Sequence, residues 1–186
     1  KVKNVNSSSF TLCSESTLAL FYRYKCKSLN KTTCKNEGCR GLTELTLPKR
    51  LKRIGYDAFR GCTGLTKLAL PKSVTHIDTL AFDGCTGLEK ITVESGNSCY
   101  DSRDNCNSII ETETNTLIAG CKNSVIPNSV TSIGNSAFCG CSGLTELTLP
   151  DNIHFIEGEA FMGCSGLTEL TLPNSVKSIG DRAFAY

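Results

Sequence analysis

The chain has 186 residues, of which 39% are hydrophobic and 20% are charged, and its formal net charge is +2. This composition excludes a disordered chain, and the balance of 20 basic and 18 acidic residues argues against nucleic acid as the main partner. The longest apolar run, Leu18 to Tyr22, is far shorter than the roughly 20 residues of a membrane helix, so no membrane insertion is expected in this segment.

The first 38 residues carry no copy of the repeat that follows them. We predict that residues 1–38 form a cap-like segment, because the first unit of a repeat array leaves an apolar edge that must be covered. A diverged copy of the later insert is the alternative. Cys13, Cys26 and Cys34 lie here and are candidates for disulfide bonds within the segment.

From residue 39 onward the sequence repeats. Four units align without a gap, with a spacing of 23 residues within each adjacent pair, and they start at Cys39, Cys62, Cys141 and Cys164. A fifth unit starts at Cys85 and carries 33 additional residues before the next unit. We therefore assign residues 39–186 to a repeat array with an insert at about 94–124.

The slots of the first unit predict a strand followed by a return into the core. Leu42, Leu45 and Leu47 match a strand with inward-facing leucines, and Pro48 ends it because proline has no N–H to give to a ladder. Leu51 and Ile54 then point back into the core. Stacking of the units would place these strands in parallel in one concave sheet.

The second half of the unit predicts a tight bend and a column of aromatic rings. Gly55 suits the bend, although Asp78 and Glu157 at the equivalent position indicate that a positive φ is not strictly required. About ten residues remain for the convex side, which favours short 3₁₀ or helical turns. An Ala-Phe pair recurs in every unit, which predicts a phenylalanine spine along the whole array, at Phe59, Phe82, Phe138, Phe161 and Phe184.

Within the insert, residues 109–119 predict a β-hairpin. Two stretches rich in β-favouring residues flank a polar middle that contains Asn115. We expect the strands near 108–112 and 115–119.

The pattern LxxLxLPxxVxxIGxxAFxGC resembles the BspA-like, or Treponema-type, leucine-rich repeats over residues 39–186. The expected fold is an α/β solenoid: a right-handed superhelix with a parallel concave sheet, short 3₁₀ or helical convex turns and a β-hairpin insert. The resemblance implies a cell-surface or secreted protein, often an adhesin that binds host matrix proteins or other cells. It implies no catalytic residues.

Five cysteines occupy one repeated slot: Cys39, Cys62, Cys85, Cys141 and Cys164. Stacking would hold these side chains parallel and about 5 Å apart, whereas a disulfide needs convergent Cβ atoms nearer 3.8 Å. We therefore expect buried thiols in this slot. Outside it, Cys99 and Cys106 could form a disulfide.

The strand positions between the core leucines predict exposed ladders of polar side chains. We take these ladders as the candidate binding surface, formed by Glu44, Thr46, Lys67, Lys90, Thr92, Glu146, Thr148, Glu169 and Thr171. A solenoid commonly binds through its concave face. The alternative is a merely solvated face, since threonine suits strands.

No sequence motif indicates catalysis, a metal or a cofactor. The two histidines, His76 and His154, fall in different slots of their units and would not meet. The leading hypothesis is a non-enzymatic binding or adhesion module that recognises an extracellular protein or glycan. The alternative is a structural spacer array with no ligand of its own.

Overall fold

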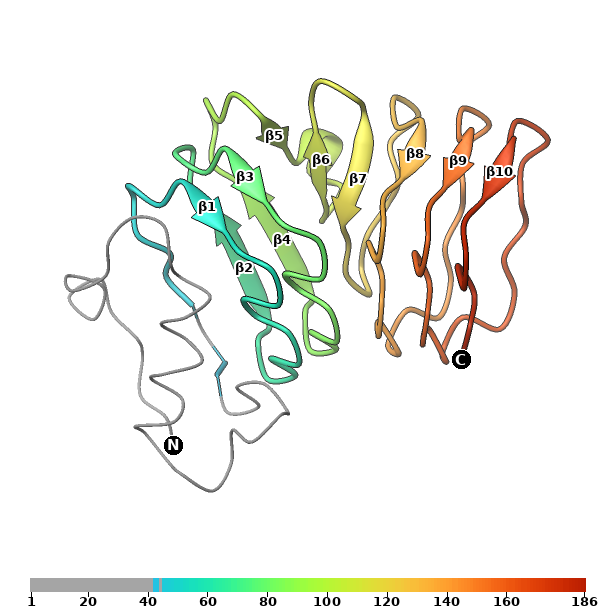
Figure 1. The fold of residues 1–186 in the computed structure, drawn as a ribbon, viewed down its shortest axis with the longest axis horizontal. Helices are drawn as coiled ribbons and strands as arrows, with labels where there is room; N and C mark the ends of the chain where they lie inside the picture. Colours follow the sequence, from blue (N-terminus) through green and yellow to red (C-terminus); the bar gives the residue numbers. More distant parts are fainter. Residues whose placement is uncertain (1–41, 44) are drawn as a thin grey trace.

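A computed structural model describes residues 42–43 and 45–186, and the account below concerns these residues. Successive turns of chain lie side by side along the longest axis of the molecule and build a β-solenoid (Figure 1). We number the turns by their last residues; each of turns 1 to 5 ends at the residue before the cysteine that begins the next turn. Turns 1 to 6 end at Gly61, Gly84, Gly120, Gly140, Gly163 and Tyr186.

The strands are short and form three sheets. β1 (Arg53–Ile54) pairs in parallel with β3 (His76–Ile77), and β2 (Lys67–Leu70) pairs in parallel with β4 (Lys90–Val93). The third sheet has the order β10-β9-β8-β7-β6-β5. Its strands are β5 (Tyr100–Asp101), β6 (Ile109–Glu111), β7 (Thr116–Ala119), β8 (Ser132–Ile133), β9 (Phe155–Ile156) and β10 (Ser178–Ile179).

Two strand positions are found along the array, where one was predicted, but turns 5 and 6 have a strand only at the second of them. Among the described residues the predicted concave sheet of leucine-slot strands is therefore limited to β2 and β4. β2 and β4 occupy the predicted leucine slots, and β2 ends immediately before Pro71 as expected. The other position, seen in β1, β3, β8, β9 and β10, lies at the isoleucine that precedes the bend. Ile54 and Ile133 are fully buried there, so the second strand also contributes to the core.

The predicted hairpin is confirmed, and it belongs to the main sheet. β6 and β7 pair antiparallel, with Glu111 opposite Thr116. β7 then pairs in parallel with β8 of the next turn. The insert is therefore continuous with the solenoid instead of projecting from it (Figure 1).

The predicted helical or 3₁₀ convex turns are not confirmed. Among the described residues the single helical element is the 3₁₀ segment η2 (Arg103–Asn105), which lies in the insert. The convex segments form turns whose N–H groups bond to the adjacent turn, as Phe59 N does to Ala81 O at 2.8 Å. A positive φ recurs two residues after the bend, which stops a helix from propagating. It is found at Asp57, Leu80, Ser136, Glu159 and Arg182.

The phenylalanine spine exists in two parts. Phe59 and Phe82 stack with ring centroids 5.5 Å apart, and a second stack joins Phe138, Phe161 and Phe184 at 5.2 and 5.3 Å. Between them turn 3 carries Gly120, whose N–H bonds to Ala137 O at 2.8 Å as Phe59 N does to Ala81 O. The prediction of a continuous spine is therefore wrong at turn 3.

The 56 residues from Cys85 to Gly140 hold two turns, where alignment of the sequence gives one interrupted unit. Ser124 N bonds to Cys121 O at 3.0 Å, just as Leu65 N bonds to Cys62 O, so Cys121 begins turn 4. Turn 3 is shortened at its convex tip. In consequence Gly84 N of turn 2 bonds directly to Cys139 O of turn 4, at 3.1 Å.

The repeated cysteine slot contains buried thiols that form no disulfide, as predicted, at Cys62, Cys85, Cys141 and Cys164. The Cys85 thiol donates to the Phe59 carbonyl and the Cys164 thiol to the Phe138 carbonyl, each at 3.1 Å. Cys99 and Cys106 are also free thiols, so the bridge considered between them is not formed. Cys13, Cys26, Cys34 and Cys39 lie outside the described residues.

These thiols should resist alkylation in the folded protein. Burial raises the pKa of Cys141 to about 12 and that of Cys164 to about 11, so both stay protonated at pH 8. We expect iodoacetamide to modify half-buried Cys99 well before either of them, as read by peptide mass spectrometry. Equal labelling rates without denaturant would contradict this burial.

Candidate binding surface

The described members of the predicted ladders are all exposed to solvent. They are Thr46, Lys67, Lys90, Thr92, Glu146, Thr148, Glu169 and Thr171, whereas Glu44 lies outside the described residues. In the β2–β4 pair, Lys67 is directly opposite Lys90 and Ala69 is opposite Thr92. The structure therefore brings the two lysines together as neighbours on one face.

The ladder is not continuous along the array. Turn 4 is short between Cys121 and Pro127, so it has no residue equivalent to Lys67 or Glu146. The ladder consequently has a basic half on turns 2 and 3 and an acidic half on turns 5 and 6. We call the whole exposed surface, both halves together, the ladder face.

A polar groove of about 560 Å³ lies beside β4 at this interruption. The ladder contributes Lys67, Lys90 and Thr92 to its lining. The insert and turn 4 contribute four further polar residues, Ser102, Asn105, Asn107 and Asn123. These four residues were not predicted, because nothing in the repeat pattern relates the insert to β4. The one sequence feature that could have indicated them is the high frequency of asparagine in the insert.

The groove has an excess of positive charge. Glu89 lines the groove beside Lys67 and Lys90, but Lys122 compensates this carboxylate, with Nζ 2.8 Å from Oε1. The hydrogen bond from Lys122 and then its charge lower the pKa of the Glu89 carboxyl, and the charge of Lys67 acts in the same direction. Lys67 and Lys90 themselves have no ion pair with a described residue. Their ammonium groups are available to a ligand.

The insert side of the groove is held in a defined conformation. Asn105 and Asn107 both have φ of +52°, in the left-handed region that asparagine tolerates. Arg103 ties the loop that carries these asparagines to the β-hairpin. Its guanidinium pairs with Asp101 at 2.7 Å and donates to Asn115 at 2.9 Å. The groove is thus preformed, which lowers the entropic cost of binding.

A buried hydroxyl network joins the insert to turn 4 beneath the groove. Ser124 Oγ accepts from Cys121 N at 2.8 Å, donates to Asn107 O at 2.7 Å and lies 3.0 Å from Ser108 Oγ. Ser108 is completely buried. Each hydroxyl therefore satisfies groups that water cannot reach.

Replacing Ser124 with alanine should lower the free energy of unfolding by about 1–3 kcal/mol, because it leaves the buried Cys121 N–H without its acceptor. Urea denaturation followed by circular dichroism measures the loss. The exposed Ser142, changed to alanine in the same way, should shift stability by about 0.5 kcal/mol at most. Similar values for the two variants would show that the network does not hold the insert in place.

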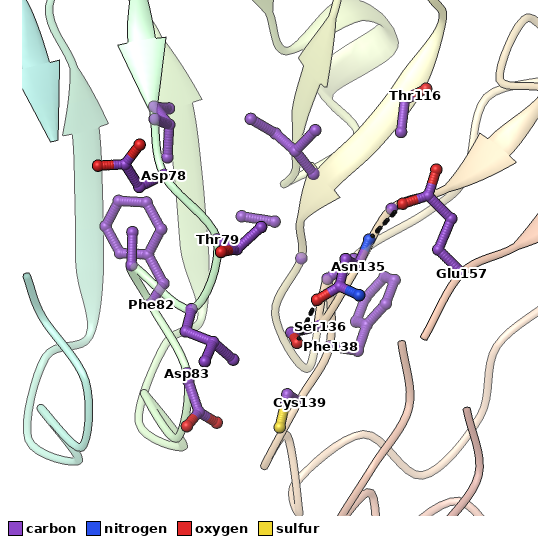
Figure 2. A pocket seen from close by; sticks show the side chains of 18 of the residues that line it. Asp78, Thr79, Phe82, Asp83, Thr116, Asn135, Ser136, Phe138, Cys139 and Glu157 are labelled. Carbon is purple, nitrogen blue, oxygen red and sulfur yellow. Dashed lines mark hydrogen bonds between the residues drawn. The ribbon is translucent and has the colours of Figure 1, made fainter. Parts of the chain in front are cut away.

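A second hollow, of about 300 Å³, lies where the phenylalanine spine is interrupted. Phe82 forms one wall and Phe138 the other, and Ile118 to Gly120 of turn 3 line the space between them. Figure 2 shows the two rings on opposite sides, with Asp83 beside Phe82 and Glu157 beyond Asn135. No residue of this hollow also lines the groove.

The histidines do not meet. His76 Nε2 lies 2.8 Å from Asp78 on the exposed side of β3, whereas His154 packs against Phe155. Within the described ranges, no group of three or more His, Cys, Asp and Glu side chains could hold a metal ion. No helix in the same part of the chain has the length and apolarity to cross a membrane.

A family model described as "BspA type Leucine rich repeat region" matches residues 27–121 and 116–186, in six copies. Comparison with curated proteins found no match. Among solved structures, a leucine-rich repeat protein from Eubacterium ventriosum has a TM-score of 0.65 and 25% identity, and the match covers 74% of this chain and 37% of that one.

Two further structures support the fold alone. The pneumococcal vaccine antigen PcpA has a TM-score of 0.59 and 24% identity, with 72% of this chain and 46% of that one covered. A leucine-rich cell surface protein from Faecalibacterium prausnitzii has a TM-score of 0.57 and 24% identity, with 79% and 52% covered. The match therefore spans about half or less of the length of each of these proteins.

Proposed function

Because the chain belongs to the BspA-type leucine-rich repeat family, we propose that it is a non-enzymatic binding module of a cell-surface or secreted protein. Its partner is an extracellular protein or glycan, and its location is the cell surface or the extracellular space. Solenoids of stacked repeats present extended surfaces to partners, and the ladder face is such a surface. This reading requires no cofactor.

The polar groove beside β4 is the observation that carries the proposal. It brings two lysines without ion pairs together with amide and hydroxyl groups on a preformed surface. Ammonium and amide N–H groups donate hydrogen bonds, and the charge excess favours an acceptor-rich, negatively charged ligand. An acidic segment of a protein or an acidic glycan has this chemistry.

A screen against extracellular matrix proteins and acidic glycans, followed by affinity measurements on each ligand found, tests the proposal. The double variant Lys67→Glu/Lys90→Glu should weaken binding about tenfold or more, because two attractive charges become repulsive. Lys52→Glu/Lys177→Glu is the matched control: it makes the same change of net charge at exposed lysines away from the groove. That control should retain wild-type affinity at moderate salt.

The acidic half of the ladder face is tested by Glu146→Lys/Glu169→Lys. Unchanged affinity in this variant confines the site to the groove, and altered affinity extends it along the array. If a longer form of the protein binds a ligand and this array binds none, the spacer function is correct and the proposal fails.

A further inference from the structure

The hollow in the phenylalanine spine is a consequence of how turn 3 is built. Phe59, Phe82, Phe138, Phe161 and Phe184 occupy one slot of five turns, and their stacked pairs are nearly parallel, with interplanar angles of 6° to 10°. Turn 3 has Gly120 in that slot. Turn 3 therefore adds no ring to the column: the ring of Phe138 lies over Gly120, and the hollow is lined by Phe82 on one side and Phe138 on the other.

The protein cannot fill this position with a side chain of its own turn. A β-carbon added at Gly120 would collide with the ring of Phe138. The tips of turns 2 and 4 meet beyond the hollow, where Gly84 N bonds to Cys139 O at 3.1 Å. The space that remains, about 300 Å³, is at the lower end of the range of ligand pockets. An occupant must come from another molecule.

The charge around the hollow selects a cation. Its lining includes four carboxylates, from Asp78, Asp83, Glu111 and Glu157, and no basic side chain. Asp78 and Asp83 are already paired with Arg53 and Arg60, which do not line the hollow.

Glu111 and Glu157 differ from that pair, because they make no ion pair with a described residue. Glu157 accepts only from the Asn135 N–H, at 3.0 Å, and Glu111 accepts from the Thr114 hydroxyl at 2.7 Å. Two carboxylates without a counter-charge among the described residues thus line a hollow that has aromatic walls. Figure 2 shows Glu157, one of the two, on the Phe138 side.

We propose that this hollow binds the guanidinium group of an arginine side chain presented by a protein partner. A guanidinium is flat, stacks on aromatic faces and forms two parallel hydrogen bonds with a carboxylate. It therefore matches both the aromatic walls, Phe82 and Phe138, and the uncompensated carboxylates. A lysine ammonium is a compact, strongly hydrated charge that would not complete a stack. This site is additional to the groove and does not depend on it.

The test is a titration of ¹⁵N-labelled protein with N-acetyl-arginine amide, followed by NMR. We expect saturable shifts for the amides of Ile118, Gly120 and Phe138. N-acetyl-citrulline amide has nearly the same shape without the charge. Its affinity should be lower than that of the arginine probe by about tenfold or more. N-acetyl-lysine amide should also be weaker.

Glu111→Gln/Glu157→Gln should weaken the arginine probe about tenfold or more, while the Asn135 N–H keeps an acceptor in the glutamine carbonyl. Glu146→Gln/Glu169→Gln removes the same charge on the ladder face and should bind the probe as the wild type does. Equal binding of arginine and citrulline probes, shifts that map elsewhere, or an unaffected pocket variant would overturn the proposal. None of these outcomes bears on ligand binding in the groove, so the two proposals fail separately.

Discussion

Replacing Phe138 with alanine is expected to lower the free energy of unfolding by about 3–5 kcal/mol, the usual cost of deleting a fully buried phenylalanine. The side chain is 1% exposed, its ring stacks on Phe161 at 5.2 Å, and it covers Gly120 on the other side. It is thus the ring that joins the second stack to shortened turn 3. In a solenoid, stability depends on contacts between neighbouring turns, so this loss falls on one interface.

Urea denaturation of Phe138→Ala and Phe184→Ala measures the effect against a matched control. Phe184 occupies the same slot in the last turn but is 36% exposed and stacks on one described ring. Its replacement should cost about 1–2 kcal/mol, because less apolar area is removed from the core. If the two variants lost the same stability, Phe138 would not have the special position between turns that the structure gives it.

The second large effect is expected at Gly140, where turns 2 and 4 touch. Its φ is +71°, and a β-carbon there would lie 2.8 Å from the Gly84 Cα and 3.1 Å from the Gly84 N. A left-handed conformation costs an L-residue about 1–2 kcal/mol, and forcing atoms into a packed contact costs about 1–3 kcal/mol more. We therefore expect Gly140→Ala to destabilise the protein by about 2–5 kcal/mol, measured by thermal or urea denaturation.

Gly96→Ala separates the two causes. Gly96 also has a positive φ, +86°, but a β-carbon there meets nothing within 4 Å. Its replacement should cost only the backbone term, about 1–2 kcal/mol. A Gly140→Ala variant no worse than Gly96→Ala would show that turns 2 and 4 do not meet at this point.

The periodic slots could be predicted because each is fixed by burial. Leu42, Leu45, Leu47, Leu51 and Ile54 are all buried, as the pattern of the first unit indicated. The same logic placed the free thiols, since stacked turns hold equivalent side chains parallel. In the first turn burial follows the period, and period can be read from one sequence.

The shortened turns could not be predicted in this way. Turn 4 begins at Cys121, but only Val125 and Ile126 separate Ser124 from Pro127. An alignment at a fixed period therefore passes over this turn. Turn 3 substitutes Gly120 for phenylalanine and loses its convex tip. Both features depend on hydrogen bonds between turns that are distant in the sequence. The groove and the spine's hollow arise from these two departures.

The helical convex turns were expected from the available length, but the backbone conformation of these segments does not allow a helix. Leu80 has a φ of +59°, a conformation that leucine rarely adopts and that composition does not signal. The stacking of turns imposes it, because Phe59 N and its equivalents must reach carbonyls of the next turn. The division into residues 1–38, an array and an insert at about 94–124 stays a prediction, as does right-handed coiling.

Hydrogen–deuterium exchange of the protein with a ligand from the screen tests most directly the claim that binding occurs at the groove. Protection on ligand addition should appear in β4 (Lys90–Val93) and in residues 102–107 and 122–124, which surround the groove. Residues 174–186 serve as the internal reference and should exchange as in the free protein. Protection confined to other turns, or none at a saturating concentration of ligand, would contradict the claim.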